Sequence, residues 1–162
     1  MMESKHENAS EVQMVIFKLD TEEFAVDINQ VREVLNMTQI TPLPRSPHYI
    51  EGVINLRGEV IPVIDLRKRF GLPELDSGER ARVVIVEIQN NNVGLTVDSV
   101  TEVLRYSAGA IQQPPSRGSG SRTDFIKGIA KLEERLLTIL NLEKILTSDE
   151  VITMEEVTVS GN

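Results

Sequence analysis

Two parts of this chain repeat each other without a gap, and this repeat limits the possible folds more than any other feature. Residues 49–68 align with residues 125–144 at a constant offset of 76, and residues 24–35 align with residues 93–104 at an offset of 69. Each copy, at about 65–75 residues, would have only a marginal core on its own. Two copies are also too few for an open solenoid, so the sequence predicts two similar units packed on each other.

Short apolar runs separated by turn residues are typical of β-strands. We expect strands in the first unit at 15–19, 24–28, 31–35, 52–56 and 60–64, and in the second at 82–88, 93–97, 100–104, 126–130 and 135–140. Five short strands per unit and no long helical periodicity predict an all-β fold of small barrels. Asp65 and Asn141 are good N-caps for short helical turns over 66–70 and 142–146. Pro62 lacks an amide donor, which predicts that its strand lies at an edge there.

The repeat and the changes in composition suggest where the domains begin and end. We expect a polar, flexible N-terminus over residues 1–13 and a folded domain over residues 14–146. Within that domain the two units cover approximately 14–75 and 80–146, and exchange of strands between them is left open. Residues 147–162 form an acidic tail. The tail could hold one more helix or fray, and the sequence does not decide between these.

The overall composition excludes several classes of function. A net charge of −8 disfavours nonspecific binding to nucleic acid or to an anionic membrane. The chain has no cysteine, and its longest apolar runs are far shorter than the ~20 residues of a membrane span. We also see no signal peptide in the polar N-terminus. The segment 45–69 carries five basic and three acidic residues, which hints at a protein partner, although ordinary surface variation would explain it too.

Residues that could perform chemistry are few and scattered. The two histidines, His6 and His48, are not paired by a spacing that suits a metal site, and no cofactor is expected. Ser46 lies two residues from His48, but no Gly-x-Ser-x-Gly motif supports a hydrolase. The glycine-rich segment 117–122 lacks the Gly-Lys-Ser/Thr of a phosphate-binding loop. The chain is therefore predicted not to be an enzyme, with a hydrolase using the His48 loop as the rival from another class.

The repeat also acts as an internal control that separates structural residues from functional ones. Apolar positions shared by both copies indicate barrel core: Val31 with Val100, Val34 with Val103, and Leu35 with Leu104. Glu33 and Glu102 are equivalent charged positions among these apolar neighbours, which suggests a surface glutamate that faces a cation. Arg57 has Glu133 as its counterpart and lies on a tight turn. An arginine there could pair with a carboxylate or anchor an interface, or could simply be solvated.

Residues 51–66, with Asn55-Leu56-Arg57-Gly58 at their centre, closely resemble the signature of the CheW family of bacterial chemotaxis coupling proteins. The resemblance extends from Phe17 to Leu146. It implies a pair of five-stranded SH3-like barrels with a groove between them. It also implies a non-enzymatic cytoplasmic adaptor that joins the cytoplasmic tips of methyl-accepting chemoreceptors to the regulatory domain of the histidine kinase CheA. A coupling protein of another receptor–kinase pathway is the rival with the same fold.

Carried over by position, the resemblance implies a surface ion pair between Glu33 and Arg57 at the binding face. It further implicates five positions in receptor or kinase contact: Val31, Gly52, Val83, Val100 and Val103. The repeat partly disagrees, because valines common to both copies indicate structure, so Glu33 and Arg57 are the stronger candidates. No nucleic acid, metal, cofactor or inserted membrane segment is expected. The loop 106–123 and the acidic tail match no hallmark of the family.

Overall fold

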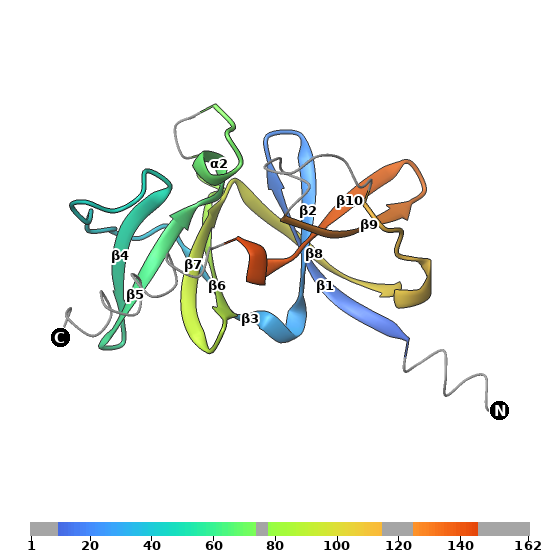
Figure 1. Cartoon of the computed structure of the whole chain (residues 1–162), viewed down its shortest axis with the longest axis horizontal. Coiled ribbons are helices and arrows are strands. Elements are labelled where there is room, and N and C mark those ends of the chain that lie inside the picture. The colour runs from blue at the N-terminus through green and yellow to red at the C-terminus, as the bar shows by residue number, and fades with distance from the viewer. Residues whose placement is uncertain (1–9, 74–77, 115–124, 146–162) are drawn as a thin grey trace.

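The computed structural model describes residues 10–73, 78–114 and 125–145 (Figure 1). Its strands are β1 (Glu11–Leu19), β2 (Glu22–Asp27), β3 (Val31–Asn36), β4 (Ile50–Leu56), β5 (Glu59–Asp65), β6 (Arg82–Ile88), β7 (Asn91–Val97), β8 (Ser99–Ser107), β9 (Ile126–Leu132) and β10 (Arg135–Leu140). Short helical turns lie between them: η1 (Ile28–Gln30), α2 (Leu66–Arg69), η2 (Ala108–Ala110) and η4 (Leu142–Lys144). The acidic tail, residues 1–9 and residues 115–123 of the loop after β8 lie outside the described residues.

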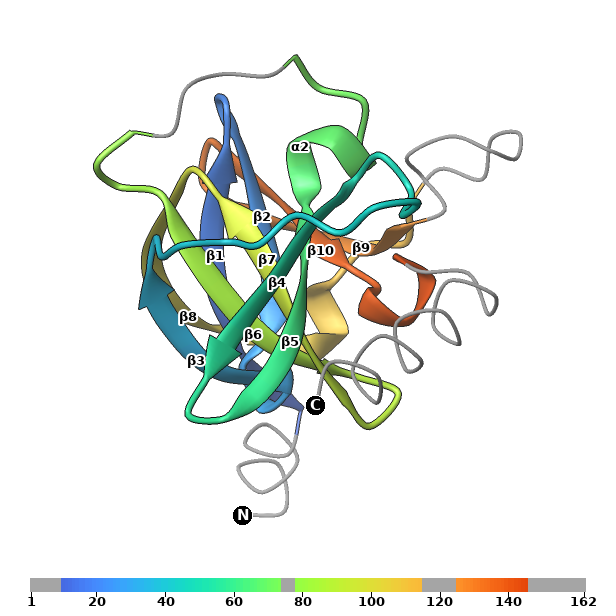
Figure 2. The same ribbon diagram turned by 90° about the vertical axis from the view of Figure 1, so that its left-hand side faces the viewer.

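The described strands form two five-stranded sheets, which confirms the all-β fold predicted from the sequence. One sheet has the order β8-β1-β2-β10-β9, and we call it barrel A. The other has the order β3-β6-β7-β5-β4, and we call it barrel B. Figure 1 shows the two side by side along the long axis, and Figure 2 shows barrel B in front. Equivalent strands of the two repeats hold equivalent places in the two orders, β4 and β5 matching β9 and β10.

The two sheets do not divide the chain where the two repeats divide it. Each barrel contains the first two strands of one repeat and the last three strands of the other. Barrel B is therefore one continuous segment from β3 to β7, whereas barrel A combines β1 and β2 with β8 to β10. A boundary between 14–75 and 80–146 does not separate the barrels, because it runs through the middle of barrel B.

Two equivalent backbone bridges close the barrels. In barrel B the amide and carbonyl of Thr41 exchange hydrogen bonds of 2.8 Å with those of Val53. In barrel A the same exchange joins Gln112 to Ile129, at 2.9 and 2.8 Å. Gly52 precedes Val53 with a φ of 152°, and a Cβ there would lie 2.1 Å from the carbonyl oxygen of Thr41. This close approach requires glycine at the point of closure.

The core has three parts. Barrel A has a buried interior of Met14, Ile16, Ala25, Ala130, Leu137 and Ile139. Barrel B has a buried interior of Ile54, Ile61, Val63, Val83 and Ile85. The largest group, the interbarrel cluster, takes residues from both sheets: Val15, Phe17, Leu19, Phe24, Val26, Tyr49, Ile50, Ile64, Leu66, Phe70, Val84, Val86, Ile88, Val93, Leu95, Val97, Leu140, Leu142 and Ile145. Because the largest of the three buried clusters contains residues of both barrels, the barrels stabilise each other.

Arg67 of α2 joins the two barrels by ion pairs. It is only 7% exposed. Its guanidinium donates to both carboxylate oxygens of Asp98, at 3.0 and 2.6 Å, and to Asp20 at 2.5 Å. Asp98 lies where the chain passes from β7 of barrel B to β8 of barrel A, and Asp20 lies in the β1–β2 turn of barrel A. A further hydrogen bond of 2.7 Å reaches the carbonyl of Pro73. No sequence motif predicts this cluster, because its members are far apart in the chain.

Arg69, on the same helical turn, contacts two residues that the repeat makes equivalent. Its guanidinium lies 4.4 Å from the ring centroid of Tyr49 and 4.9 Å from that of Phe125. Its Nε donates to the carbonyl of Ile145 at 2.7 Å. Tyr49 leads into β4 of barrel B and Phe125 into β9 of barrel A, so this cation–π contact also connects the barrels.

Most local predictions are confirmed. The Asp65 carboxylate accepts from the amides of Arg67 and Lys68 as the N-cap of α2, and Asn141 caps η4. Pro62 pairs with Val53 of β4, and the pairing of β5 with β7 starts one residue later, so the strand has an edge at Pro62. The N-terminal boundary is wrong, however. β1 begins at Glu11, since residues 11–13 pair with residues 105–107 of β8.

Candidate partner-binding surface

Glu33 and Arg57 meet on the surface of barrel B. Glu33 lies on the edge strand β3, and Arg57 lies in the turn between β4 and β5 with a φ of 53°. Arg57 donates from Nη2 to Oε1 of Glu33 at 2.5 Å and from Nη1 to Oε2 at 3.3 Å. The contact is therefore bidentate, which is the most specific geometry between an arginine and a carboxylate. The ion pair that the family resemblance implied is present.

This ion pair is fixed by two hydrogen bonds and is exposed at the surface. The Arg57 side chain is 70% exposed and the Glu33 side chain 32% exposed. The hydrogen bond from Arg57 is the main cause that lowers the pKa of Glu33, and the same bond raises the pKa of Arg57. Both groups therefore stay charged through the physiological pH range. Because the guanidinium has donors beyond the two that reach Glu33, it can also donate to a second carboxylate on another protein.

Barrel A carries a different version of the same arrangement. Glu102, the counterpart of Glu33, accepts from Arg135 at 2.7 Å. Arg135 also donates to Glu23, at 3.0 and 2.7 Å. Arg135 begins β10, whereas the turn position equivalent to Arg57 is Glu133, with a φ of 56°. The arginine of barrel A is thus shared by two carboxylates and is only 36% exposed, so its charge is less available to a partner.

The other five residues that the resemblance implicates lie at different depths. Val103 is 52% exposed on the edge strand β8. Val31 and Val100 are partly buried and pack against the interbarrel cluster. Val83 is fully buried in the interior of barrel B, and Gly52 is buried at the bridge that closes this barrel. The structure therefore brings Val103 to the surface but not Val83 or Gly52, whose substitution would act on a partner only through the fold.

Val34 is an exposed residue that the sequence analysis assigned to the core. Val34 is 41% exposed and its counterpart Val103 is 52% exposed, so the prediction that both lie in the core is wrong. The reason is that β3 and β8 are edge strands whose side chains alternate between core and solvent. Val34 pairs with Val84, and Val103 pairs with Val15. Since Val84 and Val15 belong to the interbarrel cluster, the two exposed valines extend that cluster to the surface.

The serine and histidine of the loop before β4 do not form a catalytic pair. The hydroxyl of Ser46 donates to the carbonyl of Leu43 at 2.9 Å, and its single proton is thereby used. The ring of His48 packs edge-on against Tyr49, with centroids 5.8 Å apart. Within the described part of the chain, no group of three or more His, Cys, Asp or Glu side chains could hold a metal ion. No helix among the described residues is long and apolar enough to span a membrane.

Several known proteins match this chain over nearly its whole length. The model of the CheW-like domain matches residues 13–150. A probable chemotaxis protein CheW of Rhizobium etli is 34% identical over 143 residues, which are 88% of this chain and 92% of that protein. The chemotaxis protein CheW of Bacillus subtilis is 36% identical over 84% of this chain and 87% of its own length.

A solved structure agrees. The crystal structure of the scaffolding protein TtCheW from Thermoanaerobacter tengcongensis is 38% identical, covers 86% of this chain and 94% of its own, and superposes with a TM-score of 0.79. Its likeness extends over both barrels, and the sequence match is continuous across them. This chain belongs to the CheW-like family.

Proposed function

We propose that this chain is a non-enzymatic scaffold of bacterial chemotaxis that couples membrane chemoreceptors to the histidine kinase CheA. The observation that carries the proposal is the match to CheW proteins along almost the entire chain, including a crystal structure described as a scaffolding protein. The described residues add two exposed features that suit a scaffold: the Glu33–Arg57 pair on barrel B and the surface valines Val34 of β3 and Val103 of β8.

The two features suit different partners. Val34 and Val103 are exposed on the edge strands β3 and β8, and Val31 and Val100 of the same strands pack against the interbarrel cluster. Exposed apolar side chains of this kind suit the apolar face of an amphipathic helix from a partner. The Glu33–Arg57 pair presents a fixed charge pattern, and such a pattern selects its partner and its orientation. We assign the valines to the receptor and the charged pair to the regulatory domain of CheA.

The coupling requires no bond to be made or broken. A rigid body that holds the receptor at one face and the kinase at another raises the effective concentration of each partner for the other. The interbarrel cluster and the Arg67 ion pairs supply the rigidity, because both join barrel A to barrel B. Such a scaffold would act in the cytoplasm, held at the inner face of the membrane by the receptors.

Binding of purified partners tests the proposal. The chain should bind the CheA regulatory domain and a chemoreceptor tip at the same time. Val103→Lys should weaken binding of the receptor tip only, and Arg57→Glu should weaken binding of the CheA domain only. Glu133→Arg, which reverses the charge of the equivalent turn in barrel A, is the matched control and should change neither. Binding of neither partner would refute the proposal, and capture of a different receptor–kinase pair would assign the chain to another pathway.

A further inference from the structure

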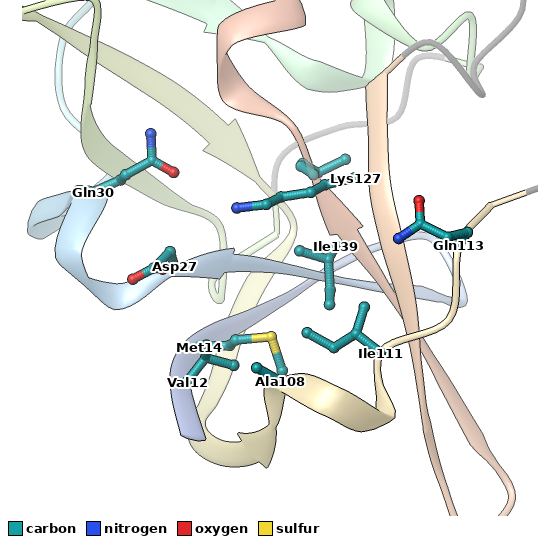
Figure 3. Close-up of a pocket in the computed structure, with 10 residues that line it drawn as sticks. Val12, Met14, Asp27, Gln30, Ala108, Ile111, Gln113, Lys127 and Ile139 are labelled. Carbon is teal, nitrogen blue, oxygen red and sulfur yellow. The ribbon is translucent and has the colours of Figure 1, made fainter. Parts of the chain in front are cut away.

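A pocket of about 210 Å³ opens into the core of barrel A beside η1 and η2 (Figure 3). Its floor is formed by six apolar residues: Val12, Met14, Ala108, Ile111, Ile139 and Leu140. Met14 and Ile139 belong to the buried interior of barrel A, and Val12 and Ile111 pack against that interior. The pocket contains none of the residues assigned above to the receptor or to the kinase.

The rim of the pocket is polar and carries one charge of each sign. Lys127 of β9 and Gln113 stand on one side, and Asp27 and Gln30 stand on the other. In Figure 3 the Lys127 side chain reaches across the pocket above Ile139. The ammonium group of Lys127 has no ion pair or hydrogen bond to any other residue that the structure describes. Among the described residues, the Asp27 carboxylate accepts only from the amide of Asn29, through Oδ1 at 2.8 Å, and its second oxygen has no partner there.

Barrel B shows that the barrel fold does not require this pair of charges. The repeat places Glu51 at the position of Lys127 and Thr96 at the position of Asp27. The Thr96 hydroxyl lies 3.5 Å from the carbonyl of Ile64 in its own barrel. Val83 and Val63, which match Met14 and Ile139, are fully buried. In the residues that the structure describes, the combination of an apolar floor, a cation without a partner and a carboxylate with one oxygen unused is therefore found in barrel A and not in barrel B.

The size and the charges together define the ligand. A volume of 210 Å³ equals that of about seven water molecules, which is below the ~300 Å³ of the smallest typical drug-sized pockets. One branched aliphatic group fills such a space, with its polar end at the rim. We infer that the pocket binds an aliphatic α-amino acid of about the size of leucine. Lys127 receives the carboxylate, the second oxygen of Asp27 accepts from the ammonium group, and the apolar floor buries the side chain.

Titration with three related compounds tests this inference on the unmodified protein. L-leucine, 4-methylpentanoate and isoamylamine share the aliphatic group. Leucine carries both charges, 4-methylpentanoate only the negative charge and isoamylamine only the positive charge. Leucine has about nine non-hydrogen atoms, so we expect a Kd on the order of 1 mM, measured by amide chemical shifts around Ala108 and Lys127. The acid and the amine should each bind at least about tenfold more weakly, because each leaves one charged group of the rim without a partner.

Variants locate the site. Lys127→Met and Asp27→Asn should each weaken leucine binding by about tenfold, and asparagine preserves the cap on η1. Ala108→Leu should abolish binding by filling the floor. Glu51→Gln, at the matching position of barrel B, is the control and should bind leucine normally. Thermal melting shows that each variant is folded, and Lys127→Met should bind the CheA regulatory domain as the unmodified chain does, so that this test is independent of the proposed function.

Three results would overturn the inference. The first is an absence of shifts with leucine at about 10 mM, tenfold above the expected Kd. The second is binding of 4-methylpentanoate as tight as that of leucine, which would show that the pocket recognises an acid alone. The third is unchanged leucine binding in folded Ala108→Leu, which would place the binding elsewhere on the molecule.

Discussion

Glu33 and Glu102 occupy equivalent places on the edge strands β3 and β8, and each accepts from an arginine of the hairpin that closes its barrel. The arginine comes from a different position in each copy: Arg57 lies in the turn itself, and Arg135 lies at the start of the following strand. Arg135 is held between two carboxylates at 36% exposure, whereas Arg57 has one and is 70% exposed. The repeat thus preserves the ion pair and exposes it most in barrel B.

Loss of Arg67 should destabilise the whole protein. Arg67→Met leaves Asp20 and Asp98 close together without their cation, and removing one partner of a fully buried ion pair costs roughly 3–5 kcal/mol. The two carboxylates are each 34% exposed, so water compensates in part and we expect about 2–3 kcal/mol. Urea unfolding measures this. Arg32→Met, which removes a 55% exposed partner of Glu87, is the control and should cost less than about 1 kcal/mol. Equal losses in both variants would contradict the role given to Arg67.

Asp98 should make the protein sensitive to acid. Burial raises the pKa of Asp98, but the hydrogen bonds from Arg67 and from the Asp20 amide outweigh it, so the pKa lies below its ordinary value. The folded state then binds fewer protons than the unfolded state, and the stabilisation is complete above about pH 5 and is lost as the pH falls below about 4. Unfolding at pH 7, 5, 4 and 3 should therefore show a weaker pH dependence in Asp98→Asn. An unchanged slope would show that other carboxylates cause the acid sensitivity.

Gly52 and Gly58 should respond very differently to alanine. A Cβ at Gly52 would lie 2.1 Å from the Thr41 carbonyl, so Gly52→Ala must break the bridge that closes barrel B. We expect a loss of more than about 3 kcal/mol or an insoluble protein. Gly58, with a φ of 88°, has open space around the added atom, so Gly58→Ala should cost only about 1 kcal/mol of backbone strain. Similar melting temperatures for the two variants would exclude a special role of Gly52 in closure.

The sequence predicted the local structure well, because local structure depends on neighbouring residues. The ten expected strands each overlap an observed strand, and the caps at Asp65 and Asn141 follow from the hydrogen-bonding capacity of these side chains. The start of β1 was missed because residues 11–13 are polar or isolated in the sequence. They become a strand only through pairing with β8, which lies about ninety residues further along the chain.

Features that depend on long-range packing could not be read from the sequence. The repeat predicts two similar units, but either pairing of their strands satisfies the same alternation of residues, so the composition of each barrel was left open. The Arg67 cluster joins residues 20, 67 and 98, which no motif connects. For the candidate surface, Glu33 and Arg57 were found because the repeat and the family resemblance agreed. The exposure of Val34 could not be predicted, because a valine in an apolar segment indicates a core position. Only the strand order shows that its strand lies at the edge of the sheet.

The affinity of the CheA regulatory domain for four proteins tests the central claim most directly: the unmodified chain, Glu33→Arg, Arg57→Glu and the double reversal. Each single reversal places like charges together, so binding should fall at least about tenfold. Melting should shift by less than about 3 °C, because exposed ion pairs contribute little to folding. The double reversal restores the ion pair on the surface and should recover part of the affinity. Unchanged affinity in both single variants, with both folded, would contradict the assignment of this surface to the kinase.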